Sequence, residues 1–442
     1  MIMKKRYMAG LLAALLLLGG CGSDTPAEPA GTTASPTQAA TPTEAPADPS
    51  PTEEAAPTEA EPESIFAGKL TEGIEISYPE LKSYTVPENE GTAFTAKLGV
   101  GYNLGNTFDA YDDDGYAENE LAIEEYWQGV HTTEQLIKDI HAFGFDSIRM
   151  PVSWHNHVSD DLTISEAWLD RVNEVVDYAV NDGMYVIINI HHDNHSAPKG
   201  FYPDQANAAQ SDRYISRIWS QLAERFKDYD EHLIFESMNE PRLVGHENEW
   251  WFNPSNPDCV EAAKRINELN QLFVDTVRAS GGNNASRFLM CPGYCASLDG
   301  CTNAWFKLPT DSGGFENRII LEVHGYTPYS FALEYPGTDS FSIDSAGSTG
   351  DISTLITKLY SKYICAGIPV IIDEFGARDK GGNLQDRVNY AAYYSAVAAS
   401  RGIPVFWWDN GAFSGDGEIF AIVDRRNTDN SLFDIIAALT KK

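Results

Sequence analysis

The stretch HLIFESMNE (residues 232–240) decides the fold predicted for this sequence. It begins as an apolar run of strand length and ends in an amide and a carboxylate, Asn239 and Glu240, directly before Pro241. Because proline cannot donate to a sheet ladder, the strand is expected to end there. Glu240 would then stand at the carboxyl end of a buried strand, the position where barrel folds gather functional side chains.

Seven further runs of this kind occur from residue 97 onward. They are KLGVGYNLG (97–105), FDSIRMPVSW (145–154), MYVIINIHHD (184–193), RFLMCPG (287–293), RIILEVHGY (318–326), IPVIIDEFG (368–376) and IPVFWWDNG (403–411). Such nearly continuous apolar runs are expected of strands that are buried on both faces of a parallel sheet.

Amphipathic stretches occupy the intervals between these runs. They are TTEQLIKDIHAFGF (132–145), SEAWLDRVNEVVDYAVNDGM (165–184), RYISRIWSQLAERFKDY (213–229), AAKRINELNQLFVDTVRASGG (262–282) and DRVNYAAYYSAVAASRG (386–402). The eight-fold alternation predicts an α/β fold, a (β/α)8 TIM barrel with enlarged strand-to-helix loops. The alternative, a doubly wound open sheet, would want a G-x-G-x-x-G motif after its first strand, and GVGYNLGN (99–106) lacks that spacing.

The N-terminal part of the chain has a different composition. Residues 1–21 carry basic residues, an apolar run and small residues before Cys21, which predicts a secretory signal too short to span a membrane. LGGC (18–21) resembles the lipobox of bacterial lipoproteins, which implies a lipid on Cys21 and an exported protein anchored at the bacterial cell surface; the alternative is an ordinary signal peptide and a secreted protein. Residues 22–63, rich in Pro, Thr, Ala and Glu, predict a disordered tether.

The remaining chain is predicted to consist of two parts. Residues 64–96 show no strong period and are expected to form a hairpin or cap that closes the bottom of the barrel. Residues 97–442 are expected to form the (β/α)8 catalytic domain.

Charge and cysteine content exclude some classes of function. A net charge of −34 argues against a nucleic-acid partner, because phosphates would be repelled. Apart from Cys21 there are five cysteines, an odd number that leaves at least one outside any intrachain disulfide. No CxxC spacing occurs among them, so a zinc site is not expected. HHDNH (191–195) could be a metal cluster, but His191 and His192 would point to opposite faces if the strand continues.

Polar side chains collect at the predicted strand ends. In chain order they are Asn103, Arg149, His191, His192, Asn239, Glu240, His324, Tyr326, Glu374, Trp407 and Trp408. The two carboxylates, Glu240 and Glu374, end the fourth and seventh strands, which lie across the barrel from each other. A facing pair of carboxyl groups suits glycoside hydrolysis, in which one group donates a proton to the leaving oxygen and the other attacks the anomeric carbon.

The neighbours of these carboxylates suggest how their roles divide. Arg149 is the cation expected to keep Glu374 ionised, and Tyr326 can donate a hydrogen bond to Glu374. Asn239 can bind a substrate 2-hydroxyl. Trp408 is expected to point inward and form a flat floor for a pyranose ring, whereas Trp407 is expected to point toward the helices. In a retaining enzyme of this kind the two carboxyl groups should lie about 5 Å apart.

These motifs together resemble glycoside hydrolase family 5, the cellulase-type family, over about residues 97–436. The matching segments are GYNLGNTFDA (101–110), IRMPVSW (148–154), INIHHD (188–193), FESMNEP (235–241), VHGY (323–326), IDEFG (372–376) and FWWDNG (406–411). GYNLGNT, together with YWQG (126–129), looks most like subfamily 4, largely endo-β-1,4-glucanases.

The resemblance implies an activity and a set of site residues. It implies a retaining endo-β-1,4-glucanase that acts by double displacement on internal bonds of cellulose-type, mixed-linkage or xyloglucan polysaccharides, with Glu240 as acid/base and Glu374 as nucleophile. The implied enzyme needs no cofactor or metal, and its partner is a β-glucan substrate; we expect a monomer. The supporting residues would be Arg149, His191, Asn239, His324, Tyr326 and Trp408, with Asn103 and Trp127 toward the non-reducing-side subsites.

Two departures from the family pattern bear on specificity. Tyr102 stands where the family often has Trp, and Gln128-Gly129 where Gly-Asn is common, both expected near the glycone side. β-Mannanase or xylanase activity on the same scaffold stays open, whereas a non-catalytic sugar-binding barrel would be expected to lack one carboxylate. Trp250 and Trp251 are expected either to stack on sugars in the aglycone subsites or to pack their loop onto the barrel.

Overall fold

The computed structural model describes residues 65–442 except 83, 113–118, 416 and 441–442. These residues belong to one compact unit, Pro62–Lys442. The predicted signal peptide, Cys21 and the tether up to residue 63 lie outside the described residues. Among the helices that are described, none combines the length and the apolar character needed to cross a bilayer.

Eight parallel strands close into a barrel in the order in which they occur along the chain. They are β1 (Val100–Leu104), β2 (Ser147–Met150), β3 (Tyr185–Asn189), β4 (Leu233–Glu236), β5 (Leu289–Pro292), β6 (Ile319–His324), β7 (Val370–Phe375) and β8 (Val405–Asp409). Each of the eight predicted runs contains one of these strands, and the predicted (β/α)8 fold is confirmed. The first and last strands pair over their whole length, which closes the ring.

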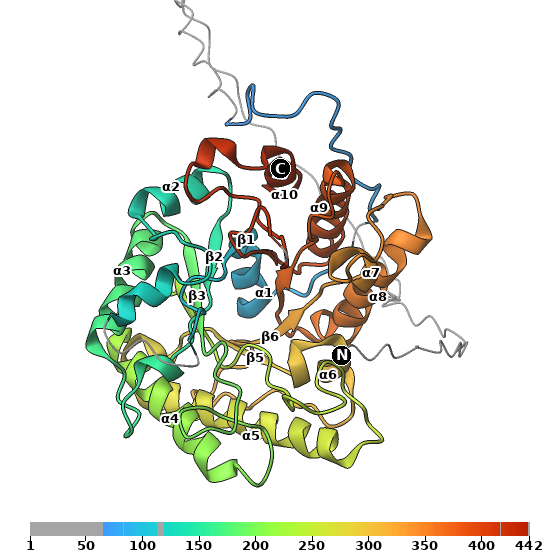
Figure 1. Cartoon of the computed structure of the whole chain (residues 1–442). Coiled ribbons are helices and arrows are strands. Elements are labelled where there is room, and N and C mark those ends of the chain that lie inside the picture. The colour runs from blue at the N-terminus through green and yellow to red at the C-terminus, as the bar shows by residue number, and fades with distance from the viewer. Residues whose placement is uncertain (1–64, 83, 113–118, 416, 441–442) are drawn as a thin grey trace, which may run out of the picture. The chain divides into compact units, whose positions relative to one another are not determined.

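Helices surround the strands, as Figure 1 shows in a view into the barrel. They are α1 (Glu90–Thr95), α2 (Glu134–Ala142), α3 (Glu166–Asn181), α4 (Ala208–Arg225), α5 (Pro257–Ala279), α6 (Leu298–Thr302), α7 (Tyr329–Ala332), α8 (Ala346–Lys362), α9 (Leu384–Ala399) and α10 (Phe433–Thr440). The five predicted helices correspond to α2, α3, α4, α5 and α9. Two longer helices were not predicted. After Ala346, the start of α8 consists of Gly, Ser, Thr and Gly, which are weak helix formers, and nearly all of α10 is buried, which removes the polar face.

Local sequence signals explain where the helices begin and end. The side chain of Thr133 accepts a hydrogen bond from the backbone N–H of Leu136 and so caps α2. Helix α3 ends at Asp182-Gly183, where Gly183 adopts a φ of 91° that an L-residue rarely takes.

The end of the fourth strand differs from the prediction. Strand β4 stops at Glu236, not at Pro241, so the expectation that proline terminates it is wrong. The backbone N–H of Ser237 still donates to Met290 of β5, but that of Asn239 donates to Ile190, beyond the end of β3. The segment 237–240 therefore leaves the ladder and follows the rim of the barrel, which carries Glu240 over the mouth.

The amino-terminal end of the barrel is filled by apolar side chains. Phe94 of α1 stacks on Phe288 with ring centroids 3.7 Å apart, and both pack against inward-facing residues such as Ile234 and Phe406. The segment before β1 thus supplies a short helical plug, and its described residues contain no hairpin. Because this end is plugged, the opposite end of the barrel is the open mouth.

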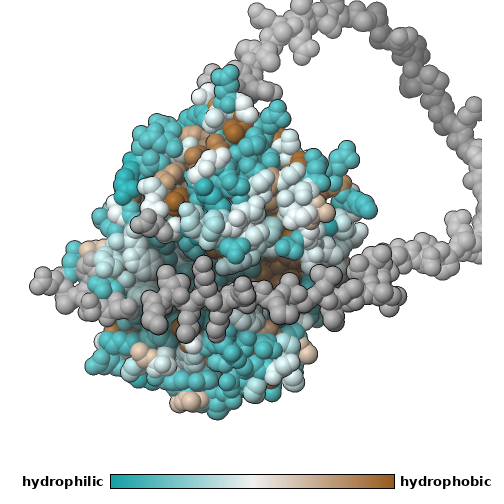
Figure 2. Space-filling view, turned by 45° about the vertical axis from the view of Figure 1, so that its right-hand side comes forward, coloured by the Kyte–Doolittle hydropathy of each residue, from teal (hydrophilic) through white to brown (hydrophobic). Residues whose placement is uncertain are grey.

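The surface and the cysteines agree with the composition. The face seen in Figure 2 is mostly hydrophilic, with small, separated hydrophobic patches. The five cysteines of the described residues, Cys259, Cys291, Cys295, Cys301 and Cys365, are all free.

Candidate active site

Arg149 of β2 lies at the centre of the barrel mouth and is wholly buried. Its Nε and Nη2 donate to the two carboxylate oxygens of Glu236, at 2.6 and 2.7 Å. Its Nη1 donates to Glu374 Oε1 at 2.6 Å and to Asn103 Oδ1 at 3.0 Å, and Nη2 also donates to Asn239 Oδ1 at 2.7 Å. A guanidinium has five N–H donors, so these five bonds use all of them. Arg149 therefore positions other site residues and leaves no donor for a substrate.

Glu374 of β7 is held by two donors from different elements. Arg149 binds its Oε1, and the hydroxyl of Tyr326 donates to its Oε2 at 2.9 Å. The side chain is almost fully buried. Both predicted partners of Glu374 are thus in contact with it, and a carboxylate with each oxygen occupied by a donor is fixed in position and favoured in its charged form.

Glu240 shares a hydrogen bond with His324 of β6. His324 Nδ1 lies 2.7 Å from Glu240 Oε1 and 3.4 Å from Glu374 Oε2, so one imidazole nitrogen faces both carboxylates. Burial opposes the charged imidazole, but the negative charges of Glu374, Asp373 and Glu240 outweigh it and raise the pKa of His324 to about 9. Burial acts to raise the pKa of Glu240, yet the hydrogen bond and charge of His324 lower it to about 2.

The two titrations belong to one hydrogen-bonded pair. Between these two pKa values His324 and Glu240 together hold a proton that can lie on either side of the 2.7 Å contact. The pair can therefore supply a proton through Glu240 at pH values well above the pKa of an isolated carboxyl group. It loses this proton only as the pH rises through the pKa of His324.

The two carboxylates are close to each other. Atoms of Glu240, His324 and Glu374 lie within 4.8 Å of one another. Carboxyl groups about 5 Å apart are typical of retaining glycosidases, whereas inverting enzymes need about 6.5 Å or more to admit a water. The separation agrees with the predicted spacing and leaves no room for a water between the two groups.

His191 and His192 both face the mouth, contrary to the expectation that they would point apart. Strand β3 ends at Asn189, and Asp109, His191 and His192 bring potential ligand atoms within 4.8 Å of one another. Asn189 Oδ1 accepts the N–H of Val152, so the Asn189 amide nitrogen faces His191 Nδ1 at 3.0 Å. His191 therefore carries its hydrogen on Nε2 and presents a donor there, which does not suit a metal ligand.

His191, His192 and Tyr111 line a cavity of about 700 Å³, and further rings pack against these residues. Trp408 lies parallel to His191, with centroids 5.9 Å apart and planes 2° apart. Trp127 contacts His192 with centroids 5.6 Å apart and is about a third exposed. Trp407, as predicted, points away from the mouth into the core around Phe375. The inward and outward alternation predicted for β8 is confirmed.

Two residues lie elsewhere than predicted. Asn103 is fully buried: its Nδ2 donates to the carbonyl oxygens of Asp373 and Trp407, so it supports Arg149 beneath the site and not a sugar subsite. Tyr102 is also fully buried, on the outer face of β1, where its hydroxyl accepts from Arg425. Neighbouring residues on a strand face opposite sides, so Tyr102 cannot reach the mouth when Asn103 points inward.

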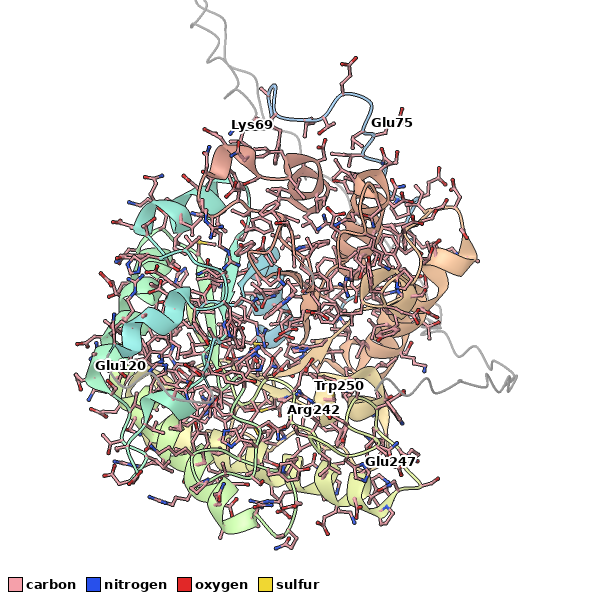
Figure 3. All side chains as sticks on the ribbon, viewed as in Figure 1. Lys69, Glu75, Glu120, Arg242, Glu247 and Trp250 are labelled. Atoms are coloured by element: carbon pink, nitrogen blue, oxygen red, sulfur yellow. The ribbon has the colours of Figure 1, made fainter. Side chains whose placement is uncertain are left out.

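The β4 loop extends the site on one side. Arg242 Nη1 lies 3.5 Å from Glu240 Oε2, and its guanidinium stacks 4.1 Å above the ring of Trp250. Figure 3 shows Arg242 and Trp250 side by side in this loop. Trp250 and Trp251 are both about half exposed, so neither is consumed by packing the loop onto the barrel.

Four polar residues of the site were missed by the sequence analysis. They are Asn189 in β3, Glu236 in β4, Glu322 in β6 and Asp373 in β7, all fully buried. Each stands inside an apolar strand, a place where a charged or amide side chain needs a partner. That mismatch was the signal that could have found them.

Several known proteins are similar to this chain. The sequence model described as Cellulase (glycosyl hydrolase family 5) matches residues 111–414. Endoglucanase B of Ruminococcus albus is 43% identical over 337 residues, which cover 76% of each chain. Endoglucanase B of Neocallimastix patriciarum is 42% identical over 335 residues, 74% of this chain and 66%, just under two thirds, of that protein.

Solved structures are similar over a larger part of their own length. A family 5 lichenase from Caldicellulosiruptor sp. F32 superimposes with a TM-score of 0.80 at 49% identity, over 83% of this chain and 99% of its own. A GH5-4 broad specificity endoglucanase from Ruminococcus champanellensis, with bound cellotriose, superimposes with a TM-score of 0.74 at 39% identity, over 81% of this chain and all of its own.

We predict that Arg149→Met lowers the free energy of unfolding by about 3–5 kcal/mol, because it leaves Glu236 and Glu374 buried without their cation. Denaturant unfolding measures the change. Lys97→Met is the matched control, since it breaks the half-exposed pair with Glu231 and should cost less than about 1 kcal/mol. Equal losses in the two variants would contradict the central role given to Arg149.

Proposed function

Because this chain belongs to glycosyl hydrolase family 5, the cellulase family, we propose that it is an endo-β-1,4-glucanase that hydrolyses internal bonds of cellulose-type or mixed-linkage glucans with retention. The relatives named endoglucanase and lichenase support this substrate class. Xyloglucan is the further glucan that we include in the proposal.

One observation carries the mechanism: Glu240 and Glu374 approach within 4.8 Å across the mouth and are held differently. Glu374 receives two hydrogen bonds, from Arg149 and Tyr326, which suits an ionised nucleophile. Glu240 shares a proton with His324, which suits a group that must give and take one.

The reaction follows from this asymmetry. Glu374 attacks the anomeric carbon while Glu240 transfers a proton to the departing glycosidic oxygen, and a glycosyl ester forms on Glu374. Glu240, now without its proton, accepts one from a water that attacks the same carbon. The ester is cleaved, and the configuration at the anomeric carbon is retained.

Side chains around the carboxylates can hold the sugar in place. Trp408 offers a flat face parallel to His191, against which a pyranose ring can stack. Arg149 occupies the Asn239 oxygen, so the Asn239 amide nitrogen is left to donate to the 2-hydroxyl of the substrate. His191 offers its Nε2–H to another hydroxyl. Trp250 stands on the opposite, aglycone side, next to Arg242.

We predict that the full chain releases reducing sugar from mixed-linkage β-glucan and carboxymethylcellulose, and that Glu374→Ala reduces the rate by about 10⁴-fold or more, because no nucleophile remains. Xyloglucan, xylan and mannan complete the substrate panel. Release from mannan or xylan alone would keep the mechanism and overturn the substrate. No release from any polysaccharide would favour a sugar-binding barrel.

Glu240→Ala is expected to abolish turnover of polysaccharides but to keep the first step on a 2,4-dinitrophenyl β-cellobioside, since that leaving group departs without a proton. A burst of dinitrophenol followed by slow turnover is the measurement. Glu247→Ala, which removes an exposed carboxylate of the same loop (Figure 3), should behave like the unaltered protein. A Glu240→Ala variant that still cleaves glucan at the normal rate would contradict the assignment of Glu240 as the acid/base.

We also propose that the protein is exported, monomeric and anchored through a diacylglycerol on Cys21. The lipobox-like LGGC and the following tether motivate this proposal. Cells fed a radioactive fatty acid should label the full chain and should not label Cys21→Ser. Equal labelling of the two would contradict the anchor.

A further inference from the structure

Beneath the mouth of the barrel lies a closed cluster of three titratable side chains: Glu322 and His324 of β6 and Asp373 of β7. Glu322 and Asp373 are fully buried and His324 nearly so. Within the described part of the chain, both carboxyl oxygens of Glu322, both of Asp373 and Nε2 of His324 lack a hydrogen-bond partner. Buried polar atoms without partners are rare in native proteins, so five in one cluster need a physical explanation.

Protons explain this cluster best. The guanidinium of Arg149 lies 3.2 Å from Asp373 Oδ2, and its N–H groups are already directed to other acceptors. An ionised carboxylate without a donor is strongly disfavoured in such a place. Burial accordingly raises the pKa of Glu322 well above its usual range and that of Asp373 to about 8. Glu322 is neutral at all working pH values, whereas Asp373 becomes charged in the mildly alkaline range.

His324 connects this cluster to the reaction. Its Nε2 lies 3.7 Å from Glu322 Oε1 and 3.7 Å from Asp373 Oδ1, while its Nδ1 contacts Glu240 at 2.7 Å. A carboxylate on one imidazole nitrogen and the reacting group on the other is the arrangement by which serine hydrolases orient a histidine. The buried carboxyls here face His324 Nε2 from the side away from Glu240, at 3.7 Å and without a hydrogen bond.

We propose that Asp373 is a positioning residue that acts through His324: it directs the imidazole Nε2–H inward and retains the proton that His324 and Glu240 share. This inference rests on the proposed function. In the first step the one shared proton passes from His324 Nδ1 through Glu240 to the glycosidic oxygen, which leaves a neutral imidazole and an ionised Glu240. The proton that Glu240 takes from water in the second step restores the pair, so no proton is gained or lost over the cycle.

The charges around His324 come from several elements. The acids that face it are Glu240 after β4, Glu322 on its own strand and Asp373 and Glu374 on β7, with Glu236 of β4 behind Arg149. Arg149 of β2 and Arg242 of the β4 loop are the nearby cations, and Tyr326 donates to Glu374. Asp373, whose pKa burial raises to about 8, changes charge between neutral pH and the His324 value.

Asp373→Asn therefore has a predictable effect on pH dependence. Removing a negative charge beside the imidazolium lowers the pKa of His324, so the alkaline limb of kcat/KM on mixed-linkage glucan should move toward neutral pH by about one pH unit or more. Glu322→Gln is the matched control: it also replaces a buried carboxyl by its amide, but it changes no charge, and the limb should stay in place. Circular dichroism over the same pH range confirms that both variants are folded.

Two further measurements separate this proposal from its alternatives. The substrate 2,4-dinitrophenyl β-cellobioside releases dinitrophenolate, which departs without an acid. With this substrate the alkaline limb of kcat/KM should not differ between Asp373→Asn and the unaltered chain. Titration of ¹⁵N-histidine-labelled protein, with His324 assigned by His324→Asn, should show its pKa falling in Asp373→Asn, and this readout stands even if no glucan is cleaved. An unmoved His324 titration, an equal shift in Glu322→Gln, or a stoichiometric divalent ion whose removal moves the limb would overturn the proposal.

Discussion

The whole mouth of this barrel depends on one buried guanidinium. Arg149 donates every one of its N–H groups to a side chain from another strand or its extension, so it fixes Glu236, Asn239 and Glu374 relative to β2. A buried charge is tolerated only when it is paired and hydrogen-bonded, and the pairing here is complete. Glu374, the proposed nucleophile, is thereby positioned by the same contact that makes the burial of Arg149 possible.

The two ends of the barrel interior are filled by different kinds of side chain. At the plugged end, Phe94, Phe288 and Phe406 fill the interior with apolar contacts that need no partner. At the mouth, polar side chains fill the interior and must satisfy one another, which is costly unless each donor meets an acceptor. The apolar plug buries hydrophobic surface and so stabilises the barrel. The mouth can therefore contain polar side chains that contribute to the reaction more than to stability.

The fold could be predicted from the sequence because it depends on period and length, which are local. The site was predicted less completely, because its polar residues inside strands, such as Glu236 and Asp373, were concealed in apolar runs. Strict alternation along β1 would have placed Tyr102 outside once Asn103 was inside. The departure of residues 237–240 from the ladder could not be predicted, since it depends on contacts with Ile190 and Met290 from other strands.

The two carboxylates differ in whether their hydrogen-bonding partners can release a proton. Arg149 cannot give up a proton in a protein, and the Tyr326 hydroxyl, buried beside a carboxylate, has its pKa raised well above 10 by burial and by Glu374. Both groups that donate hydrogen bonds to Glu374 therefore stay protonated. The partner of Glu240 is an imidazole, which can pass a proton and recover it. The difference between nucleophile and acid/base is thus set by the neighbours, because the two carboxyl groups themselves are chemically alike.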